Sequence, residues 1–151
     1  MKNIFLLMLI FCCFSCDNGK NEYIQSANNI NRMLLNYFKE YGEISEDMTN
    51  IAINDFTGIS SYRAENQSEI LELEKKASSV ITEIDKLSSS KYKCEKIDKL
   101  FQDMRHDIME SLYNVKYESG NYLFSDRAYT ISTNQLRYMQ QYDIELRSLV
   151  N

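Results

Sequence analysis

The sequence predicts an all-α fold, a compact antiparallel bundle of four to five amphipathic helices. The chain of 151 residues contains no proline and only four glycines, whereas sheet proteins need turn residues at many strand ends. Apolar residues recur at alternating steps of three and four, the spacing of one helix face, and no long stretch alternates with period two. Short polar links between the periodic segments favour antiparallel neighbours around one core.

The first two helices are predicted at about residues 22–41 and 45–57. The first has its apolar face at Tyr23, Ala27, Ile30, Leu34, Tyr37 and Tyr41. Gly42 is the predicted stop, and the following "SED" suits an N-cap with acids in the first turn. The second helix has its apolar face at Met48, Ile51, Ala52 and Phe56. Gly58 interrupts this segment, and its continuation into the next element stays open.

Three longer helices are predicted at about residues 67–87, 94–117 and 125–150. Each has one apolar face with helical spacing. In the first the face comprises Ile70, Leu73, Ala77, Val80, Ile84 and Leu87. In the second it comprises Ile97, Leu100, Phe101, Met104, Ile108, Leu112 and Val115. In the third it comprises Ala128, Ile131, Gln135, Leu136, Met139, Tyr142, Leu146 and Leu149.

The charge balance argues against nucleic acid as a partner. The net charge is −5, from 17 basic and 22 acidic residues. No basic stripe interrupts this acidic character, so a phosphate backbone would be repelled on average.

The first 16 residues have the organisation of a cleaved export signal. Lys2 supplies a positive charge, and residues 4–14 form an uncharged apolar run. A spanning helix needs about 20 apolar residues, so this run is too short for a permanent anchor. The adjacent Cys12 and Cys13 cannot close a normal disulfide with each other. A zinc site would need a second cysteine pair downstream, where only Cys94 remains.

The stretch "IFCCFSC" followed by "DNGKNE" resembles the lipobox of bacterial lipoproteins, whose signal peptidase cuts before a cysteine that receives diacylglycerol. The resemblance implies that Ser15 precedes the cut and that Cys16 is the lipid attachment site. Cys13 and Phe14 depart from the strict pattern, in a way similar to the looser lipoboxes of spirochaetes and Bacteroidetes. A plain secreted protein and an uncleaved anchor are the alternatives.

The same resemblance implies three segments of the chain and a location in the cell. Residues 1–15 would be the signal peptide, residues 16–22 the lipidated cysteine with a short tether, and residues 23–151 the bundle domain. Two or three acyl chains on one cysteine give stable anchoring, so the protein is expected at a membrane of the cell envelope. Asp17 and Asn18 fit more than one destination, which leaves inner or outer membrane, and periplasmic or surface side, open.

One cluster of titratable residues is a candidate metal or acid–base site. Asp103, His106, Asp107 and Glu110 have helical offsets that could bring an imidazole beside carboxylates. Because the apolar residues of this helix define its core side, we expect the acids on its flank and His106 in water. The sequence shows no nucleophile motif and no phosphate-binding loop. We therefore expect no enzyme, no cofactor and no metal, with a metal-dependent or carboxylate-based envelope enzyme as the alternative.

Cysteine and tyrosine offer the remaining candidates. Cys94 has no partner for a disulfide in the mature chain, and we expect a small buried or half-buried residue rather than a reactive thiol. Tyrosines crowd the last two predicted helices, at Tyr113, Tyr117, Tyr122, Tyr129, Tyr138 and Tyr142. Tyrosine is common both in bundle cores and in binding surfaces. The sequence thus predicts a lipid-anchored module that binds a protein partner, for exclusion or immunity or as an assembly accessory.

Overall fold

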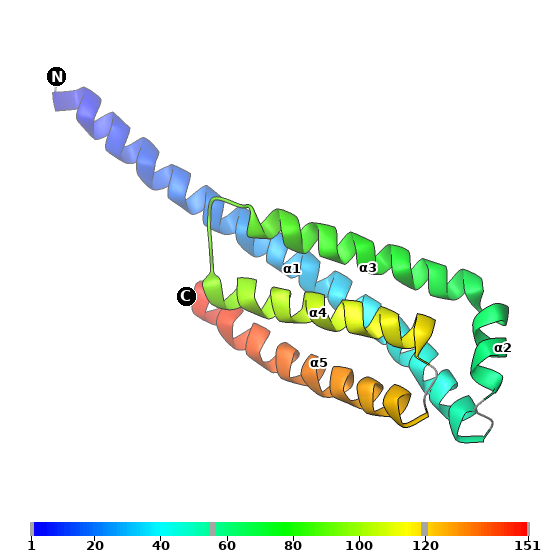
Figure 1. The fold of residues 1–151 in the computed structure, drawn as a ribbon. Coiled ribbons are helices and arrows are strands. Elements are labelled where there is room, and N and C mark those ends of the chain that lie inside the picture. The colour runs from blue at the N-terminus through cyan, green and yellow to red at the C-terminus, as the bar shows by residue number, and fades with distance from the viewer. Residues whose placement is uncertain (1, 55–56, 119–120, 151) are drawn as a thin grey trace.

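The computed structural model describes residues 2–54, 57–118 and 121–150, with side chains at 19–54, 57–118 and 124–150. The described residues form five helices, which confirms the predicted all-α bundle (Figure 1). They are α1 (Lys2–Asn54), α2 (Gly58–Glu65), α3 (Gln67–Ser88), α4 (Glu95–Tyr117) and α5 (Asn121–Val150). Within this part of the chain, no helix combines the length and apolar character needed to cross a membrane.

The four long helices alternate in direction around one core. Helix α1 packs on α3 and α5, and α4 packs on the same two helices. Helices α1 and α4 therefore face each other across the bundle and run in the same direction (Figure 1). The first turns of α1 extend beyond one end, which we call the proximal end; the α3–α4 loop and the C-terminus of α5 lie there as well. Helix α2 lies at the opposite, distal end.

The predicted stop at Gly42 is wrong, because α1 continues through it to Asn54. No described glycine has a positive φ, so Gly42 is an ordinary helical residue. The hydroxyl of Ser45 donates to the carbonyl of Gly42 at 3.1 Å instead of capping a new helix. Burial explains the continuation, since Ile44, Met48 and Ala52 extend the core stripe. A glycine inside a helix costs only about 1 kcal/mol, less than this burial contributes.

Helix α2 is a separate short helix. The sequence did not determine whether the segment before Gly58 continues into it. It folds back onto the end of α1, and Gly58 makes this approach feasible. A Cβ atom at position 58 would lie only 2.7 Å from Cγ2 of Ile51.

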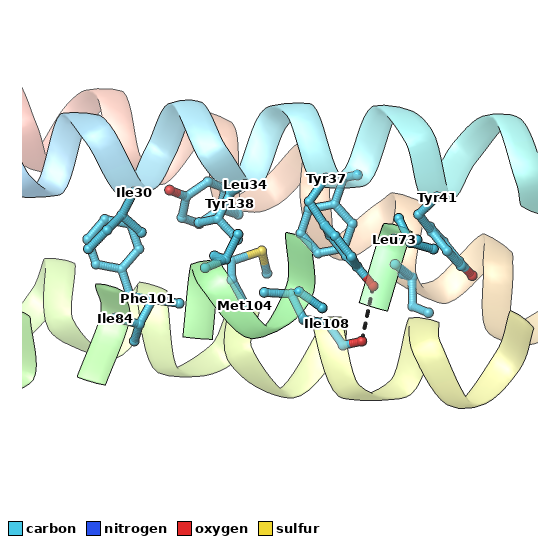
Figure 2. Close-up of a cluster of buried hydrophobic side chains, with 14 of the residues drawn as sticks. Ile30, Leu34, Tyr37, Tyr41, Leu73, Ile84, Phe101, Met104, Ile108 and Tyr138 are labelled. Carbon is cyan, nitrogen blue, oxygen red and sulfur yellow. Dashed lines mark hydrogen bonds between the residues drawn. The ribbon is translucent and has the colours of Figure 1, made fainter. Parts of the chain in front are cut away.

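The predicted core of α1, α3 and α4 is confirmed, with Ile51 and Leu112 half-buried at its edge, whereas the predicted face of α5 is confirmed only in part. Side chains from the long helices interdigitate along the bundle axis (Figure 2). On α5, Ile131 and Tyr142 are buried as expected. Leu136 and Met139, however, are 64% and 43% exposed, and Tyr138 takes the inward position. Phe56 lies outside the described residues.

Buried tyrosine hydroxyls set the height of one helix against another. Between α1 and α4, Tyr23 donates to Asp98 at 2.7 Å, Tyr37 bonds Ser111 at 2.6 Å, and the amide of Asn114 donates to Tyr41 at 3.1 Å. Between α5 and α1, Tyr138 donates to Asn31 at 2.9 Å and Tyr142 to Asn28 at 3.3 Å. The bonds of Tyr37 and Tyr41 are buried, so a shift of α1 against α4 by one turn would leave buried polar groups without partners, which is costly.

Candidate binding surface

Exposed apolar and aromatic side chains form a stripe along the distal half of α4. Met109, Tyr113 and Tyr117 are 53%, 49% and 61% exposed. They follow one another at steps of four, so they lie on one face of the helix. We call these three residues the α4 stripe. The opposite side of α4 is held in the core by Phe101, Met104, Ile108 and Val115, which fixes the stripe in solvent.

The stripe is ordered by contacts with its neighbours. The rings of Tyr113 and Tyr117 lie 5.7 Å apart. The guanidinium of Arg127, on α5, lies 5.0 Å from the ring centre of Tyr113, within the range of a cation–π contact. The same guanidinium pairs with the carboxylates of Glu110 and Glu118. Because these side chains are already held in place, a partner that binds the stripe would lose little of their conformational entropy.

Helix α2 secures the end of α4 beneath the stripe. Arg63 is half-buried, and its Nε donates to the carbonyl of Val115 at 2.6 Å. Its Nη2 donates to the carbonyls of Asn114 and Glu118. Burial lowers the pKa of Arg63, while nearby Glu118 opposes that shift. The last carbonyls of a helix have no donors within the helix, and Arg63 supplies those donors for α4.

The six tyrosines predicted as core or contact residues divide between the two roles. Tyr138 and Tyr142 belong to the core, and burial raises the pKa of both phenols. Tyr113 and Tyr117 form the exposed stripe. Tyr129 is also exposed, on a face of α5 about 200° from Arg127 and hence away from the stripe. The side chain of Tyr122 lies outside the described residues.

The acidic cluster of α4 does not converge on one point. His106 is exposed, as expected. The expectation that the acids lie on the flank is wrong for Asp107, which is buried against α5 and accepts a hydrogen bond from Asn134 at 3.2 Å. Burial raises the pKa of this carboxyl. Glu110 is instead paired with Arg127.

A hollow of about 340 Å³ lies between α4 and α5 where Asp107 is buried, and Asp103 and His106 lie on its wall. Among the described residues, no group of three or more histidine, cysteine or acidic side chains is placed to hold a metal ion.

A larger open groove of about 760 Å³ runs between α1 and α3, and the sequence did not point to it. Lys76 crosses it and pairs with Glu40 at 2.7 Å and with Glu72 at 3.2 Å. These hydrogen bonds raise the pKa of Lys76. The pair with Glu40 links α3 to α1, whereas the pair with Glu72 lies within α3.

The cysteines differ in how much the structure describes. Cys94 is half-buried at the start of α4, and among the described residues its thiol is free. Its carbonyl accepts a hydrogen bond from Tyr23 at 3.4 Å. The side chains of Cys12, Cys13 and Cys16 lie outside the described residues. The lipid attachment site and the boundaries after residues 15 and 22 stay predictions.

The α4 stripe is thus the surface at which ordered aromatic side chains reach solvent together. Comparisons of the sequence with protein-family models and with curated proteins, and of the fold with solved structures, find no match.

Proposed function

We propose that this chain is a lipid-anchored protein of the bacterial cell envelope that binds a partner protein through the α4 stripe. The observation that carries the proposal is the ordered pair Tyr113 and Tyr117 with Arg127 beside it. Tyrosine and arginine are enriched among the residues that dominate binding energies. A monomeric protein gains nothing in its own core from aromatic rings kept in solvent, and a partner surface would bury them.

The anchor and the stripe lie at different ends of the molecule. Cys16, the proposed acylation site, belongs to the part of α1 that leads into the proximal end. The stripe lies on the distal half of α4, near α2 (Figure 1). With the lipid in the membrane, this arrangement keeps the stripe accessible to another protein.

Charge on the distal half favours a partner with a basic surface. The ranges 34–54, 57–78, 106–118 and 124–136 contain twelve acidic and six basic residues. An exclusion or immunity protein that neutralises a basic toxin would use such a surface, because complementary charge speeds association and selects the partner. The assembly-accessory version differs, since it predicts that a partner helix occupies a groove between helices.

The binding proposal is tested with the lipidated protein as bait in detergent-solubilised envelope membranes. We compare the wild type with the double variant Tyr113→Ala/Tyr117→Ala and with the matched control Tyr129→Ala. The partner captured by the wild type should fall by about tenfold or more in the double variant and stay unchanged in the control. Circular dichroism checks that all three proteins fold. Equal capture by the double variant would contradict the proposal.

The anchor is tested separately by mass spectrometry of the mature protein. The N-terminal peptide should begin at Cys16 and carry diacylglycerol, and Cys16→Ser should abolish that modification. A free thiol at Cys16, or a retained leader, would contradict the anchor. The proposal assigns no catalytic role; the enzyme alternative predicts bound metal in the purified protein and loss of activity in His106→Ala.

A further inference from the structure

Charge is divided unevenly along the bundle. The proximal half contains ten basic and eight acidic residues within the ranges 19–33, 79–105 and 137–150. The distal half has the opposite balance, with twelve acids and six bases. An acidic protein therefore has one end that is not acidic, and it is the end from which the first turns of α1 emerge.

Half of the ten basic residues of that end lie on or beside the α3–α4 loop. Five lysines, which we call the lysine rim, lie at Lys20, Lys86, Lys91, Lys93 and Lys96. Between positions 86 and 96, Glu95 is the only acid. Lys91 and Lys93 are exposed at the tip of the loop. Lys86 pairs with Glu83 at 2.6 Å and Lys96 with Glu145 at 3.1 Å. Lys20 and Lys91 have no ion pair with any described residue, so the charges of these two are available to a ligand.

The rim is held against α1 beside the proposed lipid site. The rings of Tyr92 and Tyr23 lie 5.3 Å apart, which packs the loop onto α1. A Cβ atom at Gly19 would lie 3.9 Å from that of Tyr92, so the loop reaches this turn of α1. Gly19 is three residues from Cys16, or about 4.5 Å along a helix. The loop that carries Lys91 and Lys93 thus lies beside the turn of α1 that follows the proposed lipid site.

We infer that the lysine rim binds the phosphate groups of anionic lipids and holds the bundle upright on the membrane. This inference rests on the proposed anchor at Cys16, because the acyl chains keep the rim within reach of the lipid surface. Each lysine near an anionic surface favours the bound state by about fivefold. The anchor supplies a high effective concentration, so such weak contacts are sufficient. The acidic distal half is repelled by the same surface and points into solution.

The test measures the reactivity of individual lysines in the mature lipidated protein. The protein is placed on vesicles of phosphatidylcholine alone or with about one third phosphatidylglycerol, and exposed amines are acylated with a membrane-impermeant reagent. Peptide mass spectrometry then gives a rate for each lysine. On anionic vesicles Lys91 and Lys93 should react about threefold more slowly than on neutral ones. At about 0.5 M salt the difference should disappear, because screening removes the attraction. Lys39 and Lys75, exposed on the distal half, serve as internal controls whose rates should not change.

Charge-reversal variants separate orientation from anchoring. In Lys91→Glu/Lys93→Glu the protection of Lys20 should be lost, whereas in the matched variant Lys39→Glu/Lys75→Glu it should persist. If the protein floats with the vesicles but Lys91 and Lys93 react equally on both, the inference is wrong and the anchor stands. If the protein does not float with neutral vesicles, the anchor fails, and the inference fails with it.

Discussion

Replacing Arg63 by methionine should destabilise the bundle because it removes donors from the end of α4. Methionine keeps most of the apolar stem, so packing on α2 changes little, but no hydrogen bond remains. Helix ends leave carbonyls without intrahelical partners. The carbonyl of Asn114 retains the backbone N–H of Glu118 at 3.3 Å. The carbonyls of Val115 and Glu118 each lose their bond to the guanidinium.

The magnitude follows from these two lost bonds. A hydrogen bond to a charged group contributes about 1.5 kcal/mol, so Arg63→Met should lower the free energy of unfolding by about 3 kcal/mol. Urea unfolding followed by circular dichroism at 222 nm measures this loss. The matched control is Arg32→Met on α1, where the exposed guanidinium bonds, among the described residues, only the side chain of Asn29, at 2.9 Å. The control should change stability by less than about 0.5 kcal/mol. A loss below about 1 kcal/mol, or one equal to the control, would refute Arg63 as the support of α4.

Three further substitutions test the helix boundaries and the buried acid. Gly42→Ala should raise the free energy of unfolding by about 1 kcal/mol, since the site is helical and open; a loss of stability in urea would indicate a left-handed break instead. Gly58→Ala should lower it by about 2 kcal/mol because the new Cβ would press on Ile51 at 2.7 Å. Asp107→Asn should raise it by about 1 kcal/mol at pH 7, since the amide is buried without charge. Burial raises the pKa of Asp107 from 3.8, so this gain should shrink as the pH falls through the raised pKa towards 3.8, where the carboxyl is neutral as well. Thermal unfolding at several pH values checks this, and a gain independent of pH would contradict it.

Periodicity predicted the buried face correctly where most apolar residues of a helix lie on one side. In α3 the six predicted residues from Ile70 to Leu87 fit a single helix face, and all six are buried. Helix α5 is different, because it has large apolar side chains all around its circumference. Leu136 and Tyr138 lie on opposite sides, and spacing alone does not choose between them. Which of the two side chains faces the core depends on α1, where Asn31 accepts a hydrogen bond from the hydroxyl of Tyr138.

The sequence predicted tyrosine as the main residue type of the candidate site, but it did not predict which other residues contact the tyrosines. The excess of tyrosine in the last two helices pointed to this region, and Tyr113 and Tyr117 are indeed exposed there. Their neighbour Arg127 is on another helix, so its contact with Tyr113 depends on the packing of α4 on α5. Asp107 was misplaced for the same reason, because its partner Asn134 is also on α5. A contact between side chains on two helices depends on how far one helix is displaced along the other. The spacing of apolar residues within each helix does not give that displacement.

The alignment of α1 with α4 determines how far the α4 stripe lies from a membrane. Helix α1 is continuous from the proposed acylation site to the distal end, so distance along it grows by 1.5 Å per residue. Tyr41 is 25 residues from Cys16, or about 37 Å. The hydrogen bond from Asn114 to Tyr41 places the α4 stripe at the same level. If the lysine rim holds the bundle upright, a partner must meet Tyr113 about 37 Å from the lipid surface, which excludes membrane-embedded segments as the bound surface and requires a partner with a domain outside the bilayer.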